Sequence, residues 1–231
     1  MTALATETPS PMARRRVLQL TAGAAASLAA AGRPALAAWL DPTPTQLAGP
    51  FYPPLAAFSV DNDLLSRGDR AVPVAGQLLY VSGRLLDQRG RPIAGARVEI
   101  WQADNDGVYR DSKTATETGD GFQGAGHDKT DSDGRYRFRT IKPAPYGTGD
   151  LERTAHIHFL VVPPGGGEWV SQMYFTGEPR NPTDFLLKEV TTGRDRLIRD
   201  MVPAGPQAEP GAMAIDFPII MGMPGVTQRE T

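Results

Sequence analysis

Two of the three histidines in the sequence are close enough together to share one metal ion. His156 and His158 lie in the apolar run 155–162, which predicts a β-strand. Side chains two residues apart on a strand point to the same face, so both imidazoles are expected on one side of the strand and Ile157 on the other. The pair fits adjacent ligands of one metal, but it equally fits a hydrogen-bonded pair that lines a polar cleft. The spacing alone leaves both interpretations open.

Two tyrosines precede the histidine pair at the ends of predicted strands. Tyr146 follows a Pro-Ala-Pro segment, and Tyr109 ends the segment 101–109, which leaves another strand for a loop. Either tyrosine alone is typical of an amphipathic residue with a packed ring and a hydrated hydroxyl. The chain contains no cysteine, which excludes disulfides, thiolate nucleophiles and iron–sulfur clusters. Any metal must therefore be held by nitrogen and oxygen ligands.

The elements that have to position these residues are short strands separated by turns. Gly (25) and Pro (21) are more frequent than in an average chain, which favours many turns over long helices. The pattern predicts an all-β fold, an antiparallel β-sandwich with long loops and one or two short helices at 185–190 and 193–201. Alternating apolar residues predict the strands 77–85, 98–102, 136–140, 156–162, 170–175 and 214–220.

The first 37 residues are predicted to be an export signal. Arg14-Arg15-Arg16 precedes the Ala-rich stretch 20–31, and Ala35-Leu36-Ala37 is a small-x-small cleavage site. The apolar stretch is too short for a membrane-spanning helix, so no stable membrane anchor is expected. The arginines and the Val-Leu pair that follows them resemble a twin-arginine signal, with an ordinary secretory signal as the alternative. The sequence thus predicts a periplasmic or secreted protein.

The remainder divides into an arm and a catalytic body. Residues 38–75 are Pro-rich, and two prolines directly after Tyr52 favour an extended arm that lies on the domain. Residues 76–231 are predicted to form the β-sandwich. The formal net charge is −2, and four of the basic residues belong to the first 37, so the body is mildly acidic. Such a body has no electrostatic footprint for nucleic acid.

Together, the tyrosines, the histidine pair and their surroundings resemble the intradiol ring-cleavage dioxygenases, the family of the catechol and protocatechuate dioxygenases. The resemblance runs in family order from about residue 49 to 185, and the combination Tyr109, Tyr146 and His-x-His is its most specific part. The strand around Gly95–Trp101 is weaker, because prealbumin-like modules use similar strands. The matching segments are Gly49–Pro53, Gly95–Ala103, Thr130–Phe138, Ile141–Pro143, Arg153–Phe159 and Gln172–Phe175.

The resemblance implies a non-haem Fe(III) ion bound by Tyr109, Tyr146, His156 and His158. In the family pattern Tyr109 and His156 are equatorial, and Tyr146 and His158 are axial. Phenolate is a hard anionic donor that stabilises Fe(III), and the metal removes the phenol proton despite a reference pKa near 10. The implied partners are a small aromatic diol and O2. The catechol displaces Tyr146, which accepts a substrate proton, and ring opening gives a cis,cis-muconate.

Three further side chains are singled out. Arg153 matches the family arginine that stabilises negative charge on the ring, or else it is a surface arginine at a strand end. Gln172 matches a glutamine beside the ring, or else it is a solvated strand residue. His127 has no counterpart among the family ligands, and it is expected to be a loop residue within the Gly-rich segment 124–128 that could line the cleft. The short loop after Tyr146 departs from the family because it carries no further aromatic residue.

Two other functions compete with the dioxygenase. A prealbumin-like β-sandwich binding module would use similar strands, but it has no reason to assemble two tyrosines with the histidine pair. For a copper or zinc hydrolase or oxidase, the sequence lacks a third histidine at strand spacing and an obvious catalytic carboxylate.

Because members of the family tend to assemble, a homo-oligomer is expected, with the arm near Tyr52 able to pack on a neighbour. The choice among catechol, protocatechuate and hydroxyquinol stays open.

Overall fold

The computed structural model describes residues 39–53, 62–67, 70–71, 75–109 and 122–222. The predicted export signal lies outside the described residues, as do parts of the predicted arm and of the segment that follows Tyr109. Within the described part of the chain, no helix is long and apolar enough to cross a membrane.

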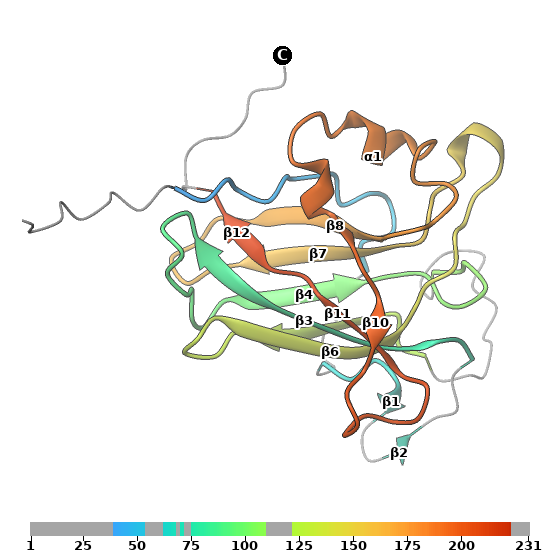
Figure 1. Cartoon of the computed structure of the whole chain (residues 1–231), viewed down its shortest axis with the longest axis horizontal. Helices are drawn as coiled ribbons and strands as arrows, with labels where there is room; N and C mark the ends of the chain where they lie inside the picture. The colour runs from blue at the N-terminus through green and yellow to red at the C-terminus, as the bar shows by residue number, and fades with distance from the viewer. Residues whose placement is uncertain (1–38, 54–61, 68–69, 72–74, 110–121, 223–231) are drawn as a thin grey trace, which may run out of the picture. The chain divides into compact units, whose positions relative to one another are not determined.

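Two five-stranded sheets carry the fold (Figure 1). In the first sheet, β6, β11 and β12 all pair with the long strand β3, and β10 extends the sheet beyond β11. Its strands are β3 (Leu78–Asp87), β6 (Arg135–Ile141), β10 (Val202–Pro203), β11 (Met213–Asp216) and β12 (Ile219–Met221). The second sheet has the order β5 (Ala125–Lys129), β4 (Arg97–Trp101), β7 (His156–Val162), β8 (Trp169–Phe175) and β9 (Ile198–Arg199). A separate antiparallel ribbon joins β1 (Ser66–Arg67) to β2 (Arg70–Ala71).

The all-β sandwich is confirmed, although both sheets are mixed rather than antiparallel throughout. β11 and β12 run parallel to β3, and β9 runs parallel to β8. The alternation of apolar and polar residues indicates that one face of a strand is buried. It does not indicate whether the neighbouring strand runs parallel or antiparallel. Parallel neighbours need long connections, and the chain between β3 and β11 provides one.

Three local predictions also need correction. The predicted strand 214–220 is split into β11 and β12 at Phe217-Pro218, because Pro218 has no N–H to donate to the ladder. The predicted helical segment 193–201 forms only a three-residue 3-10 turn and then β9, whereas α1 (Phe185–Glu189) is a helix as expected. His127 lies in strand β5 and not in a loop, because pairing with β4 outweighs the low strand propensity of the surrounding glycines.

The hydrophobic core lies between the two sheets, and the histidine pair faces away from it. Ile157 and Phe159 of β7 pack in the same buried cluster as Leu79 and Val81 of β3. Because side chains alternate along a strand, His156 and His158 are on the opposite face of the second sheet. That outer face has its own apolar cluster, which includes Trp101, Tyr109 and Leu160.

The N-terminal segment 39–53 runs along β8 and over this outer face. Gln46 N donates to Val170 O at 2.9 Å, and Gln172 Nε2 donates to Leu47 O at 3.0 Å. β9 pairs only with the last two residues of β8, so the arm satisfies backbone groups that the edge of β8 would otherwise expose. The segment thereby becomes a wall of the region around the histidines.

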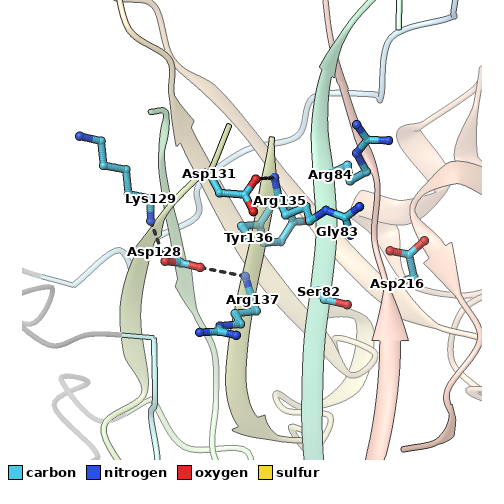
Figure 2. Close-up of a pocket in the computed structure, with 10 residues that line it drawn as sticks. All are labelled: Ser82, Gly83, Arg84, Asp128, Lys129, Asp131, Arg135, Tyr136, Arg137 and Asp216. Carbon is cyan, nitrogen blue, oxygen red and sulfur yellow. Dashed lines mark hydrogen bonds between the residues drawn. The ribbon is translucent and has the colours of Figure 1, made fainter. Parts of the chain in front are cut away.

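A hollow of about 490 Å³ opens elsewhere on the molecule, among β3, β5, β6 and β11 (Figure 2). Its lining contains side chains of both charges. Asp128 accepts the backbone N–H of Arg137, and Asp131 accepts that of Arg135. None of the residues that the sequence singled out for chemistry lines this hollow. Its lining is Ser82, Gly83, Arg84, Asp128, Lys129, Asp131, Arg135, Tyr136, Arg137 and Asp216.

Candidate metal centre

Three of the four predicted metal ligands meet around one point. Tyr109 Oη lies 3.0 Å from His158 Nε2 and 3.4 Å from His156 Nε2. The two Nε2 atoms are 3.1 Å apart. Strand β7 presents both imidazoles, whereas Tyr109 arrives from the loop after β4, where the Asp104 carboxylate accepts the N–H of Val108 at 2.9 Å. The loop is therefore folded by its own hydrogen bonds, and Tyr109 is buried.

Tyr146 joins the same group from the loop after β6. Its ring packs edge-to-face on Tyr109 with centroids 5.2 Å apart, and it is tilted against His156 at 5.5 Å. Its backbone pairs with that of Arg153 in both directions, with N–O distances of 3.2 Å and 2.7 Å. This pairing closes the short loop between them, so Tyr146 and Arg153 are positioned together. Tyr146 is only partly buried, unlike the other three predicted ligands.

Both imidazoles are held in the neutral form that binds metals. His156 Nδ1 donates to Thr154 O at 2.7 Å, which leaves the Nε2 lone pair directed at the common point. Burial and the nearby positive charge of Arg153 lower the pKa of His156 to about 3, although the Thr154 carbonyl opposes this shift. Burial and the neighbouring His156 lower the pKa of His158 well below its ordinary value.

The two phenols need a cation before they can ionise. Burial, together with Tyr146, raises the pKa of Tyr109 well above its ordinary value. Burial also raises the pKa of Tyr146, although Arg153 acts in the opposite direction. Two neutral imidazoles and two phenols around one point are a donor set that fits a hard, highly charged metal ion. In the described part of the chain, no group of three or more His, Asp or Glu side chains is placed to hold a metal ion.

Aromatic side chains wall the centre. Trp101 stacks on the His158 ring with centroids 4.7 Å apart and an interplanar angle of 9°. Phe51 of the arm stacks on Tyr109 at 4.5 Å and 12°. At Gly49 a Cβ atom would lie 3.7 Å from His158, so the arm backbone also approaches the imidazole. The two stacked contacts restrict the orientation of the Tyr109 and His158 rings.

Arg153 and Gln172 are buried and bonded to each other beside this centre. Arg153 is 5% exposed and Gln172 is 0% exposed, so neither is a solvated surface side chain. Arg153 Nη2 donates to Gln172 Oε1 at 2.6 Å and to Tyr174 Oη at 3.2 Å, and its Nε donates to Asp184 at 2.8 Å. Gln172 lies directly opposite His158 in the β7–β8 register.

The structure adds residues that the sequence did not single out and separates one that it did. Tyr174 was part of the matching segment Gln172–Phe175 and lies two positions after Gln172 on the same strand face, whereas Asp184 was recognisable only as a residue before a short helix. Phe51 and Trp101 were parts of matching segments without an assigned role. His127 lies opposite Glu99 on β5, with β4 between it and β7, and so it does not belong to the group of ligands.

The arm is fastened beside the centre by Tyr52, and this contact is testable. Tyr52 Oη donates to Oε2 of the buried Glu99 at 2.9 Å, and its ring meets Trp101 edge-to-face at 5.0 Å. Burial and this carboxylate raise the pKa of Tyr52 to about 12, so it stays a donor. We expect Tyr52→Phe to lower the free energy of unfolding by about 1–2 kcal/mol, because a buried carboxylate loses a donor.

Urea denaturation of the full chain measures this loss, and Tyr80→Phe is the matched control. Tyr80 also donates to a glutamate, but Glu209 is exposed, so water replaces the lost bond. Equal losses in the two variants would contradict the expectation.

Comparison with known proteins identifies the family of the chain. A family model described as "Dioxygenase" matches residues 47–221. The protocatechuate 3,4-dioxygenase beta chain of Burkholderia cepacia is 35% identical over 178 residues, which cover 74% of this chain and 75% of that protein. Hydroxyquinol 1,2-dioxygenase of Rhodococcus opacus is 31% identical over 73% of this chain, which spans only 57% of that protein.

A solved structure is similar over a comparable extent. The dioxygenase domain of a dioxygenase carbohydrate-binding protein fusion from Streptomyces sp. SirexAA-E has a TM-score of 0.60 and 32% sequence identity. The similarity covers 79% of this chain and 99% of that domain. Since the family model spans most of the chain, and a relative that is 35% identical is covered over 75% of its length, the chain belongs to the intradiol ring-cleavage dioxygenase family.

Proposed function

We propose that this protein is a non-haem Fe(III) dioxygenase that inserts both atoms of O2 into a catechol-type ring and releases a cis,cis-muconate. The observation that carries the proposal is the convergence of Tyr109, His156 and His158 within 3.0–3.4 Å of one another, with Tyr146 packed against them. Bound Fe(III) would supply a Lewis acid that ionises the phenols and an incoming catechol and makes the aromatic ring reactive toward O2.

Tyr146 is the ligand best placed to exchange with substrate. It is the most exposed of the four, and it reaches the centre from a short loop rather than from a strand. Its hydroxyl also interacts with Tyr109 and Arg153, which gives it partners when it leaves a metal. As a released phenolate it can accept a proton from the diol, which is a general-base role.

Arg153 supplies a fixed positive charge next to Tyr146. Its guanidinium is held on two sides, by Asp184 and by the Gln172–Tyr174 pair, so little reorganisation is needed when negative charge develops on the substrate ring. Preorganised charges in a buried site stabilise such states more than mobile charges in water. Phe51 and Trp101 stack flat on the Tyr109 and His158 rings, whereas Phe51 meets the Tyr146 ring only edge-to-face at 5.8 Å.

The test is oxygen uptake by the purified iron-loaded protein with catechol, protocatechuate and hydroxyquinol in parallel, with product spectra recorded. The expected result is O2 consumption equal to the diol consumed, muconate-type products, and a red protein. Colourless protein with one iron per chain would overturn the tyrosinate ligands. If no diol supports oxygen uptake, the proposed reaction is rejected and the prealbumin-like binding module is favoured.

We also propose that the protein is exported and acts as a homo-oligomer. Export rests on the arginine pair and the cleavage site within residues 1–37. Replacing Arg14 and Arg15 by lysine is expected to leave the protein in the cytoplasm, measured by immunoblot of cell fractions. Unaltered export of this variant would contradict twin-arginine transport.

The oligomeric state is tested by analytical sedimentation of the mature chain. A monomeric protein would contradict the proposed homo-oligomer.

A further inference from the structure

Asp184 is a fully buried carboxylate that holds Arg153 but has been given no role of its own in the proposed reaction. It is 0% exposed and stands at the start of helix α1. Its two oxygens have separate partners. Oδ1 accepts the backbone N–H of Leu187 at 2.9 Å, whereas Oδ2 accepts Arg153 Nε at 2.8 Å and the backbone N–H of Thr154 at 3.0 Å. One carboxylate thus ties the helix to two consecutive residues of the candidate centre.

Through Oδ2, Asp184 reaches both the arginine and a proposed metal ligand. The Arg153 guanidinium is held at its other end by Gln172 and Tyr174, so Asp184 fixes the plane in which it lies. Thr154 receives the second Oδ2 bond, and its carbonyl accepts the His156 Nδ1 proton at 2.7 Å. The same oxygen therefore constrains the charge beside Tyr146 and the residue that orients His156.

We propose that Asp184 is a positioning residue of the reaction, acting through Arg153 and Thr154. This inference rests on the proposed dioxygenase function. An arginine side chain has several rotatable bonds, and the Nε contact selects one arrangement of them. The contact also compensates the charge of a buried cation, whose guanidinium carbon lies 5.3 Å from the centre of the Phe185 ring.

Capping of helix α1 does not account for this arrangement. The helix has five residues, and its cap uses Oδ1 alone, a function that asparagine, serine or threonine performs comparably well. Only a carboxylate offers a second acceptor at the Oδ2 position. In Asp184→Asn, the amide oxygen can still accept the Leu187 N–H and so cap the helix. The amide NH2 group then points at Arg153 Nε–H and Thr154 N–H, which are themselves donors, so neither hydrogen bond can form. This variant separates the two roles.

The experiment compares Asp184→Asn with two controls in the iron-loaded full chain. Asp133→Asn makes the same chemical change at an exposed ion pair, and Thr183→Val removes an exposed hydroxyl bond one residue before Asp184. We expect Asp184→Asn to lower kcat roughly 10- to 100-fold, the usual effect of losing an outer-shell partner, with KM and iron content per chain nearly unchanged. Both controls are expected to keep kcat. A fall in kcat that follows iron loss or unfolding, or no fall at all, would overturn the inference.

A second readout does not depend on turnover. The Arg153 Nε–H is buried against a carboxylate, so its NMR resonance is expected to exchange slowly with water, and Arg153→Lys assigns the signal by its disappearance. Asp184→Asn should lose this protection, whereas Thr183→Val should keep it. Protection that persists in Asp184→Asn would end the positioning role. If Asp184→Asn loses the protection but the wild-type protein cleaves no diol, the hold of Asp184 on Arg153 is supported and the proposed reaction is rejected.

Discussion

Replacing His158 by alanine is expected to remove most of the bound iron. Its Nε2 atom lies 3.1 Å from His156 Nε2 and 3.0 Å from Tyr109 Oη, so the substitution removes one of the two imidazoles from the group. Loss of an outer-shell partner alone costs roughly 10- to 100-fold in metal affinity, and loss of a direct ligand should cost more. Iron per chain, measured after desalting, checks this result.

His127→Ala is the matched control for this prediction. The substitution is the same, but His127 lies on β5, and β4 separates it from the histidine pair. The control is expected to retain iron, colour and activity. Full iron occupancy in His158→Ala would show that His158 is no ligand, and iron loss in His127→Ala would show that the centre has been placed on the wrong side of β4.

Replacing Tyr109 by phenylalanine is expected to shift or bleach the visible band and to lower activity. Burial and Tyr146 raise the pKa of Tyr109 well above its ordinary value, so without a metal it stays a neutral phenol at neutral pH. A tyrosinate band therefore reports a bond between the phenol oxygen and the metal. Absorption spectra at equal iron content, followed by oxygen uptake, measure both effects.

Tyr136→Phe serves as the control because Tyr136 is equally buried and also has a hydrogen-bonded hydroxyl. It donates to the Phe217 carbonyl within the sandwich core, and burial raises its pKa as well. This variant is expected to lose stability but keep the band. An unchanged spectrum in Tyr109→Phe, or bleaching in Tyr136→Phe, would reject Tyr109 as a source of the colour.

Several features of the centre followed from the sequence because they depend on local geometry. The side chains of a strand alternate, so His156 and His158 had to share one face and Ile157 had to take the other, as the structure shows. Five of the six predicted strands were found with bounds within two residues, since burial of one face imposes the period of two directly on the chain.

Other features were decided only in the tertiary structure. The parallel pairing of β11 and β12 with β3 joins segments more than a hundred residues apart, and no local period encodes such a partner. The bond between Arg153 and Asp184 spans 31 residues and is made only when the start of α1 meets the residues just before β7. Likewise, the arm becomes a wall of the centre because β8 has an unpaired edge that needs hydrogen bonds.

The common face of the two imidazoles and the family of the chain were thus readable from the sequence, whereas the four metal ligands are predictions from the family resemblance. The tertiary structure decided which loop brings Tyr109 to that face and which buried side chains hold Arg153. The physical reason is the range of the forces involved. Backbone geometry acts over a few residues, whereas packing and burial of polar groups select partners across the whole domain.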